Sequence, residues 1–244
     1  MNKKFFIKSA ENVKLSSIFN YSKTKSDKAM IFCHGMLSGK EGIKAKFLCN
    51  NIVKHGWNTI RFDFRYRGES TEKFENITLS GEVEDLKAVY DYLITEGIKE
   101  IAIIGSSLGG TVSAIACPDL NLVSKLVLIS SPFKFEKLLL QWFTEKQIKE
   151  FQEAGFAEFG GNKINHSFLT DIKSYDFNHV LESIKCPVLL FHGTNDKVVP
   201  IENSIYSNDI LKNVYSYKTI QGGDHRLNDH INEIFPLIID FLNS

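Results

Sequence analysis

The chain has 244 residues, of which 43% are apolar and 12% aromatic, which is enough for one hydrophobic core of ordinary size. Its 29 basic and 29 acidic side chains cancel, so the basic face that nucleic acid requires is not indicated. We therefore expect a single folded domain over residues 1–244 that does not bind nucleic acid.

The amino-terminal residues and the cysteines indicate a cytoplasmic protein. Residues 1–8 hold three consecutive apolar side chains, whereas a signal peptide needs about 7 to 15, and no run reaches the roughly 18 that span a bilayer. Cys33, Cys49, Cys117 and Cys186 form no C-x-x-C pair. We expect four free, mostly buried thiols, no membrane association, and no metal or organic cofactor.

Short apolar runs alternate with amphipathic stretches along most of the chain. A strand-like pair at 5–8 and 13–19 would form an antiparallel edge, and the clearest helix runs from 80 to 96 before Gly97. Five further runs look like strands buried on both faces: 29–33, 58–64, 100–105, 125–130 and 187–193. The alternation predicts an α/β fold, a mostly parallel sheet with helices on both sides.

One interval, residues 134–183, breaks this alternation, because its ~50 residues far exceed what one crossover helix needs. With Phe133 it contains ten of the 29 aromatic residues. A long insertion of this kind is more often a lid or binding element than a plain connection. We expect a small cap within the domain whose aromatics, such as Trp142 and Phe143, contact substrate; the alternative is that they only pin the cap to the sheet.

The strand expected at 100–105 runs directly into the sequence G-S-S-L-G-G and then a helix-compatible stretch. This is a G-x-S-x-G motif in the context that gives it meaning, because a serine at a sharp strand-to-helix turn is strained and needs small neighbours two residues away on each side. Gly105 and Gly109 meet that need. Ser107 is therefore the candidate nucleophile, and Ser106 is out of register. A plain Gly/Ser turn is the alternative.

A serine nucleophile needs a base, and the base needs an orienting carboxylate. Asp196 follows the strand at 187–193, and His225 follows the strand-like V-Y-S-Y-K-T-I. Both positions correspond to the carboxyl ends of strands, where open α/β folds keep their active sites. Asp224 remains an alternative acid, and His230, expected on the last helix, an alternative base.

The third requirement is a pair of N–H donors for the oxyanion. The strand at 29–33 ends in H-G-M, where a small residue lets the backbone N–H of Met36 turn toward the nucleophile, next to the N–H of Leu108. Alone, H-G-M is equally compatible with a simple turn. Together with the other two features, it is the expected third part.

In this order, the motifs resemble the α/β-hydrolase superfamily across nearly the whole chain: H-G, D-F-R, G-S-S-L-G-G, P-V-L-L-F-H-G-T-N-D-K-V-V-P and G-G-D-H. In particular they are similar to small bacterial carboxylesterases, including cinnamoyl and feruloyl esterases, and to related serine-peptidase and monoacylglycerol-lipase groups. The resemblance implies an eight-stranded sheet with a cap after strand six. It also implies Ser107 as nucleophile, Asp196 as acid, His225 as base, and Met36 and Leu108 as oxyanion donors.

One motif departs from these relatives. Many have D-x-x-G-x-G-x-S after strand four, whereas this chain, from Asp63 to Ser70, has Tyr66 at the first glycine. The departure affects inferences about the pocket wall rather than about the catalytic residues.

These features predict a serine hydrolase that cleaves small carboxylic esters, with short-chain or aryl acyl groups, through an acyl-enzyme. Thioesterases, amidases or aminopeptidases, and monoacylglycerol lipases use the same constellation, so the motif does not separate them. A ligand-binding protein on a hydrolase fold is the non-enzymatic alternative.

Overall fold

The computed structural model describes residues 2–244. At its centre is an eight-stranded sheet in the order β1-β2-β4-β3-β5-β6-β9-β10. β2 is antiparallel to β1 and β4, and every other neighbouring pair is parallel. The strands are β1 (Asn2–Ala10), β2 (Val13–Asn20), β3 (Lys28–Cys33), β4 (Asn58–Phe62), β5 (Glu100–Ser106), β6 (Val123–Ile129), β9 (Val188–Gly193) and β10 (Val214–Ile220). The mostly parallel sheet predicted from the sequence is confirmed.

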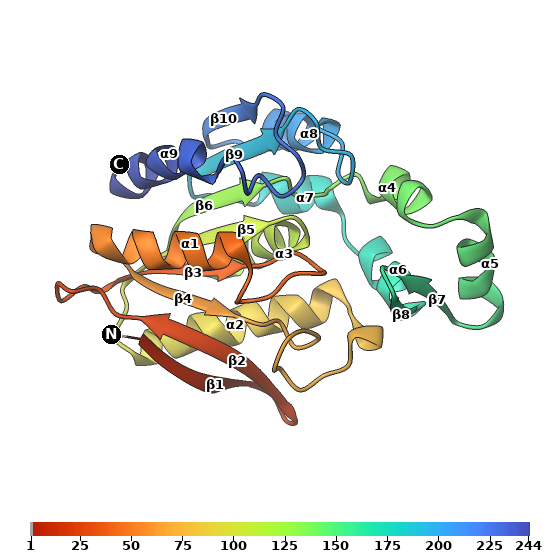
Figure 1. The fold of residues 1–244 in the computed structure, drawn as a ribbon, viewed down its shortest axis with the longest axis horizontal. Coiled ribbons are helices and arrows are strands. Elements are labelled where there is room, and N and C mark those ends of the chain that lie inside the picture. Colours follow the sequence, from red (N-terminus) through yellow and green to blue (C-terminus); the bar gives the residue numbers. More distant parts are fainter. Residues whose placement is uncertain (1) are drawn as a thin grey trace.

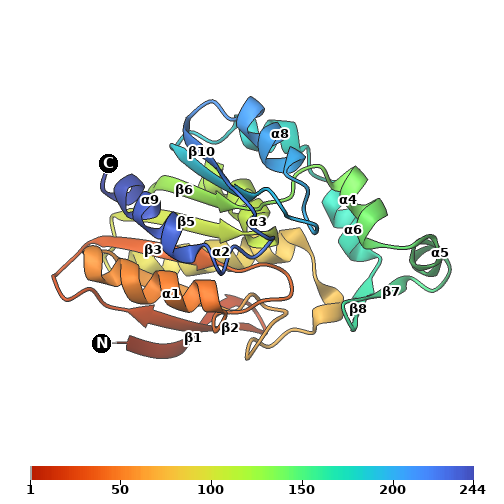
Figure 2. The same ribbon diagram turned by 45° about the horizontal axis from the view of Figure 1, so that its top comes forward.

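Helices cover both faces of the sheet (Figures 1 and 2). α1 (Ile43–Ile52) and α9 (Ile231–Asn243) pack on one face, and α2 (Leu79–Thr95), α3 (Leu108–Ala116) and α8 (Glu202–Ile210) pack on the other. Because both faces are covered, all residues of β4 and β9 are buried, which explains why neither strand alternates between apolar and exposed polar side chains. Short 3-10 helices connect some elements: η1 (Val53–His55), η2 (Phe74–Asn76) and η3 (Cys117–Asp119).

The long interval between β6 and β9 folds into small elements of its own. They are α4 (Phe135–Trp142), α5 (Glu145–Glu153), the antiparallel hairpin of β7 (Phe156–Phe159) and β8 (Asn162–Asn165), α6 (Ser167–Lys173) and α7 (Phe177–Glu182). We call residues 134–183 the β6–β9 segment. In Figures 1 and 2, α4, α5, α6 and the hairpin extend beyond the carboxyl ends of the parallel strands.

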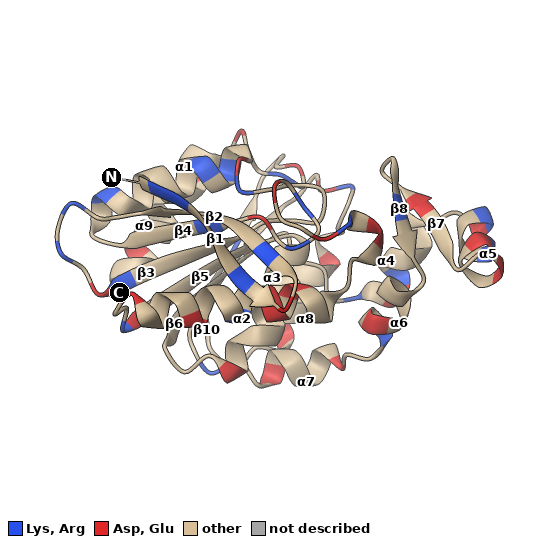
Figure 3. Cartoon of the chain, turned by 90° about the horizontal axis from the view of Figure 1, so that it is seen from below, with Lys and Arg blue, Asp and Glu red and all other residues tan. Residues whose placement is uncertain are grey.

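The charges and thiols of the described residues match the composition. Figure 3 shows acidic and basic residues interspersed over the side seen there, with both signs on α5. All four cysteines are free; three are buried, and Cys186 is half-buried. Within residues 2–244, no helix has the length and apolar character needed to cross a bilayer.

Candidate active site

Ser107 lies at the turn between β5 and α3 and adopts a left-handed backbone conformation with φ of 53°. This conformation is strained for a residue with a side chain, and the surroundings leave no room to relax. A Cβ at Gly105 would lie 2.5 Å from the Cα of Gly110, and a Cβ at Gly109 would overlap the carbonyl oxygens of Cys33 and His34. The glycines therefore allow the turn, and the turn leaves the Ser107 side chain half-exposed.

The structure brings Ser107, His225 and Asp196 together across 118 and 29 residues of sequence. The Nε2 atom of His225 is 2.9 Å from the Ser107 hydroxyl, and its Nδ1 atom is 2.8 Å from the Asp196 carboxylate. The His225 side chain is 18% exposed, whereas that of Asp196 is 0% exposed. Because an ionised carboxylate only accepts hydrogen bonds, Nδ1 carries the proton and Nε2 is free to accept the proton of the serine hydroxyl.

His192 contacts the same carboxylate and was not singled out by the sequence. Its Nε2 atom lies 2.8 Å from the carbonyl of Val199 and 3.2 Å from Oδ2 of Asp196. The carbonyl can only accept, so Nε2 carries a proton, and in the neutral ring Nδ1 accepts from the Ser204 hydroxyl, 2.6 Å away. A histidine inside an apolar strand has the sequence signature of a core residue, which is why this contact was missed.

The alternative acid and base lie elsewhere in the turn. Asp224 is exposed, and its carboxylate accepts the backbone N–H groups of Arg226 and Leu227, as a turn aspartate does. His230 was expected on the last helix but is the residue before it, where its Nδ1 atom lies 3.0 Å from Glu233. Neither side chain forms a hydrogen bond with Ser107 or His225.

Backbone N–H groups surround the nucleophile. A Cβ on Gly35 would lie 3.0 Å from Cβ of Ser107, so the chain after β3 passes directly beside the serine. Met36 is the next residue, and Leu108 is the first residue of α3. Within residues 2–244 neither N–H of these two has a hydrogen-bond acceptor. Two free donors beside a serine are what an oxyanion hole requires.

A buried lysine beneath the turn was also missed. Lys44, on α1, donates a hydrogen bond of 2.9 Å to the Ser106 hydroxyl and is 7% exposed. Burial lowers the pKa of Lys44 to about 8, although the charges of Asp224 and Asp196 oppose the shift. Ser106 therefore has a structural partner of its own.

Trp142 and Phe143, the expected substrate contacts, lie in different surroundings. Trp142 is half-buried at the end of α4, and its indole N–H donates to the carbonyl of Val198, two residues after Asp196. Phe143 is 3% exposed and packs inside the β6–β9 segment against Phe151 and Phe159, with ring centroids 5.0 and 5.3 Å away. The geometry assigns Phe143 to packing within the segment.

The β6–β9 segment reaches loops on both sides of Ser107. Trp142 bonds to the loop that carries Asp196. A Cβ at Gly160, in the β7–β8 turn, would lie 2.8 Å from the side chain of Leu37, which follows Met36.

Within residues 2–244, no group of three or more His, Cys, Asp or Glu side chains is placed to hold a metal ion.

Known proteins match this fold and sequence. The family model Peptidase_S9, the prolyl oligopeptidase family, matches residues 53–243. The palmitoyl-protein thioesterase ABHD10 of Mus musculus is 28% identical over 213 residues, 82% of this chain and 69% of that protein. The bifunctional esterase/perhydrolase DCH of Acinetobacter calcoaceticus is 27% identical over 72% of this chain and 76% of its own. The structure of Est1E from Butyrivibrio proteoclasticus with ferulic acid superposes with a TM-score of 0.87 at 22% identity, covering 98% of this chain and 97% of that one. The α/β-hydrolase resemblance is confirmed.

Proposed function

Because the chain belongs to the prolyl oligopeptidase family of α/β hydrolases, we propose that it is a serine hydrolase that cleaves carboxylic esters through an acyl-enzyme on Ser107. The observation that carries the proposal is the continuous hydrogen-bonded series from Ser107 through His225 to Asp196, at 2.9 and 2.8 Å. A nucleophile, a base within reach of its proton and a carboxylate that orients the base are the parts that acyl transfer needs.

The steps follow from the donors and acceptors. The Ser107 oxygen attacks the ester carbonyl while Nε2 of His225 takes its proton, and Asp196 stabilises the imidazolium that forms. The N–H groups of Met36 and Leu108 receive the negative charge of the tetrahedral intermediate. The imidazolium then protonates the leaving alcohol, and a water molecule, deprotonated by the same histidine, hydrolyses the acyl-enzyme and restores the serine.

We infer that the acyl group is apolar and uncharged. Leu37 and Val198 are 46% and 47% exposed, and each belongs to a loop that flanks Ser107. The β6–β9 segment, which we propose acts as a cap, contacts both loops and adds Trp142. Burial of apolar acyl surface against such residues contributes about 25 cal/mol per Å². Short-chain and aryl acyl esters are the class we propose.

The second candidate function is thioester hydrolysis. It is favoured by the similarity to ABHD10, a protein named as a palmitoyl-protein thioesterase. The same three side chains serve ester and thioester hydrolysis. The two functions therefore differ in the leaving group and the acyl-chain length of the preferred substrate, not in the catalytic residues.

The test is labelling by a fluorophosphonate probe followed by peptide mapping. We expect one labelled residue, Ser107. The variant Ser107→Ala should not be labelled, and its circular dichroism spectrum should equal that of the wild type, which shows that it is folded. Hydrolysis of p-nitrophenyl acetate, p-nitrophenyl palmitate and acetyl and palmitoyl thioesters then ranks the two candidates. Absence of labelling in the folded wild type, or labelling at another serine, would refute the proposed function.

A further inference from the structure

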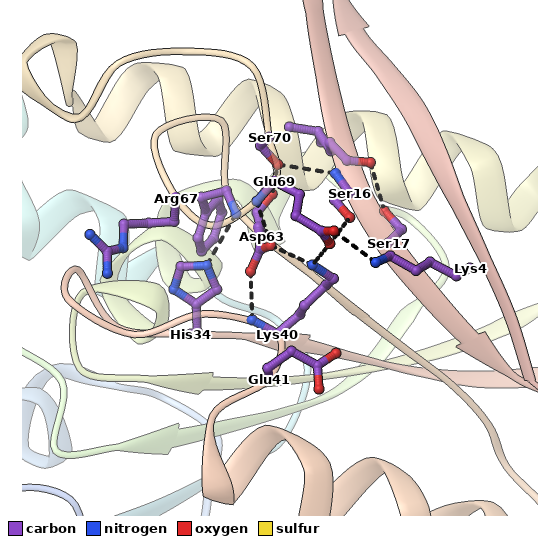
Figure 4. A network of polar contacts seen from close by, with 12 residues as sticks. Lys4, Ser16, Ser17, His34, Lys40, Glu41, Asp63, Arg67, Glu69 and Ser70 are labelled. Atoms are coloured by element: carbon purple, nitrogen blue, oxygen red, sulfur yellow. Dashed lines mark hydrogen bonds and ion pairs between the residues drawn. The ribbon is translucent and has the colours of Figure 1, made fainter.

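The loop that presents Met36 is held from outside by a second loop. The first, residues 34–40, leads from β3 toward α1, and we call it the oxyanion loop. The second, residues 63–70, follows β4 and contains the D-x-x-G-x-G-x-S positions of the sequence; we call it the 63–70 loop. Figure 4 shows the contacts between them.

Both carboxylate oxygens of Asp63 accept hydrogen bonds from Lys40, at the carboxyl end of the oxyanion loop. Oδ1 accepts the backbone N–H of Lys40 at 2.7 Å, and Oδ2 accepts the ammonium of the same residue at 2.6 Å. Both side chains are 3% exposed. One carboxylate thus bonds to the backbone and to the side chain of a single loop residue, which restrains that residue far more than a surface ion pair would.

Glycines on each loop enclose this carboxylate. A Cβ on Gly39 would lie 2.9 Å from Oδ1 of Asp63. Gly68 has φ of 57° and a Cβ there would overlap Oδ2. The second glycine of the motif is therefore needed for the carboxylate to fit, and the two loops approach each other with no free space around it.

The rest of the oxyanion loop is tied to the same partner. At its start, Nε2 of His34 accepts the backbone N–H of Phe64 at 3.1 Å, and Nδ1 donates to the carbonyl of Gly35 at 2.8 Å. Past Met36, Arg67 donates to the carbonyl of Ser38 at 3.0 Å. Met36 therefore lies between residues that the 63–70 loop holds on both sides, His34 before it and Ser38 and Lys40 after it.

A second carboxylate completes the charge balance. Lys40 also bonds to Glu69 at 2.7 Å, and Glu69 bonds to Lys4 at 2.8 Å. Burial alone would lower the pKa of Lys40, but hydrogen bonds to Asp63 and Glu69 outweigh it and raise that pKa. Two cations and two carboxylates thus alternate from the buried end at Asp63 to the exposed end at Lys4 (Figure 4).

Such a buried pair contributes little net stability, because removing two charges from water costs about as much as their attraction returns. Its value lies in geometry. An oxyanion donor is effective only within about 0.5 Å of its productive position, and Met36 lies on a loop rather than in a helix or strand. We propose that Lys40 and Asp63 are positioning residues that hold the Met36 N–H toward the oxyanion of the acyl-transfer intermediate.

The proposal rests on the proposed function, and its test separates transition-state binding from substrate binding. The main variant is Lys40→Met/Asp63→Leu, which removes both charges together and keeps the side-chain shapes. We expect kcat to fall by about 100-fold and KM to stay within about threefold. The inhibition constant of a boronic acid, whose adduct with Ser107 places an oxygen in the oxyanion position, should rise in the same proportion as kcat falls.

Three further variants make the result decisive. Lys40→Arg keeps the charge and is expected to fold, with kcat about tenfold lower, the boronic acid weakened equally, and an unchanged melting temperature. Glu69→Gln alters the end of the network where the side chain is 52% exposed and should leave kcat within about threefold. Ile238→Ala changes a buried residue of α9 in the core, and it is the control for a loss of stability that leaves both loops unchanged.

The inference is overturned if Lys40→Arg and the folded double variant retain wild-type kcat and boronic acid affinity, or lose them only as much as Ile238→Ala does. Failure of the proposed function has a different signature. In that case, the wild type does not react with a fluorophosphonate, and its rate of ester hydrolysis equals that of Ser107→Ala.

Discussion

The Asp196 carboxylate receives three hydrogen bonds and a close contact from His192. Oδ1 accepts the backbone N–H groups of Val198 and Val199 at 2.9 Å, and Oδ2 lies 2.8 Å from His225 and 3.2 Å from His192. Burial alone would raise the pKa of Asp196, but these hydrogen bonds outweigh it and hold that pKa well below its usual value. The residue therefore stays ionised when His225 takes a proton.

Two matched variants, Asp196→Asn and Asp224→Asn, decide which of the two carboxylates orients His225. Asp196→Asn should lower kcat by about 10⁴-fold, because an amide cannot hold the imidazole in the tautomer that leaves Nε2 free. Asp224→Asn should keep kcat within about threefold, since Asp224 only accepts turn N–H groups and an amide oxygen can replace it. Steady-state hydrolysis of p-nitrophenyl acetate measures both. A large loss in Asp224→Asn alone would transfer the role to that residue.

His192 should act on the reaction through Asp196. In His192→Asn, the shorter side chain cannot reach both Ser204 and the carboxylate, so Oδ2 of Asp196 loses its 3.2 Å contact with Nε2 of His192. A full hydrogen bond to a charged group is worth about 1.5 to 3 kcal/mol and this longer contact is worth less, so we expect kcat to fall by up to about tenfold with KM nearly unchanged.

Ser204→Ala, which changes the Nδ1 side of the His192 ring alone, is the control and should keep most of the activity. Equal kcat values in His192→Asn and wild type would limit His192 to packing.

At the scale of elements, the sheet was predictable and the contacts between loops were not. Most of the buried parallel strands were recognisable as short runs rich in apolar and β-branched side chains. The nucleophile turn was recognisable because strain demands glycine at two fixed positions. The β7–β8 hairpin has strands of only four residues, F-A-E-F and N-K-I-N, which are too short to show the alternation that marks a strand.

The Lys40–Asp63 pair left no sequence signal for a related reason. It joins residues 23 positions apart on two loops, and each member by itself has the composition of a solvated surface residue. The same holds for Lys44, whose partner Ser106 is 62 positions away. Long-range polar contacts have no periodicity, so they become visible only when the fold brings the loops together.

The β6–β9 segment divides its aromatics between two tasks that substitution can separate. Trp142→Ala removes a side chain that bonds to the Asp196 loop and should raise KM more than it lowers kcat. Phe143→Ala removes a ring from the buried cluster with Phe151 and Phe159, which should cost about 3 to 5 kcal/mol locally and lower thermal stability.

Steady-state kinetics and thermal melts of both variants, measured at a temperature well below the lower melting point, separate the two roles. The same KM in Trp142→Ala as in wild type would indicate that Trp142 also serves packing alone.

At the scale of the whole molecule, ionisable side chains are buried on both faces of the sheet. Glu82, on α2, is 1% exposed, and within residues 2–244 neither of its carboxylate oxygens has a hydrogen-bond partner. Burial, helped by the nearby charge of Asp85, raises the pKa of Glu82 well above its usual value. Lys44, on α1 at the opposite face, has the converse shift, a pKa lowered by burial to about 8. Neither charge favours folding.

The sign of the pH dependence follows from proton counting. Glu82 keeps its proton in the folded state, whereas in the unfolded chain it loses it above pH of about 4.3. The folded state then binds more protons, so the free energy of unfolding decreases as pH rises, by about 1.4 kcal/mol per pH unit until the folded pKa is reached. Asp196 has the opposite effect, at acidic pH. Its contribution to the free energy of unfolding is present above about pH 4 and is lost as pH falls through its depressed pKa.

Glu82→Gln should therefore stabilise the protein at neutral pH. The amide has nearly the same shape and stays uncharged in both states, so the unfolded chain no longer gains from ionisation. We expect the free energy of unfolding at pH 7 to rise by up to about 3 kcal/mol, which corresponds to about 2 to 4 °C in Tm for each kcal/mol. The gain should shrink to below about 1 kcal/mol near pH 4.5, which is close to the pKa of Glu82 in the unfolded chain.

The measurement is a series of thermal or urea melts between pH 4.5 and pH 8 on both proteins, with Asp91→Asn, an exposed acid on the same helix, as the control. Because Asp91 is solvated in both states, its variant should follow the wild-type curve. A Glu82→Gln gain that does not change with pH would mean that the carboxyl is ionised in the folded protein, with water molecules replacing the missing partners, and that the α2 face of the core is wetter than its burial indicates.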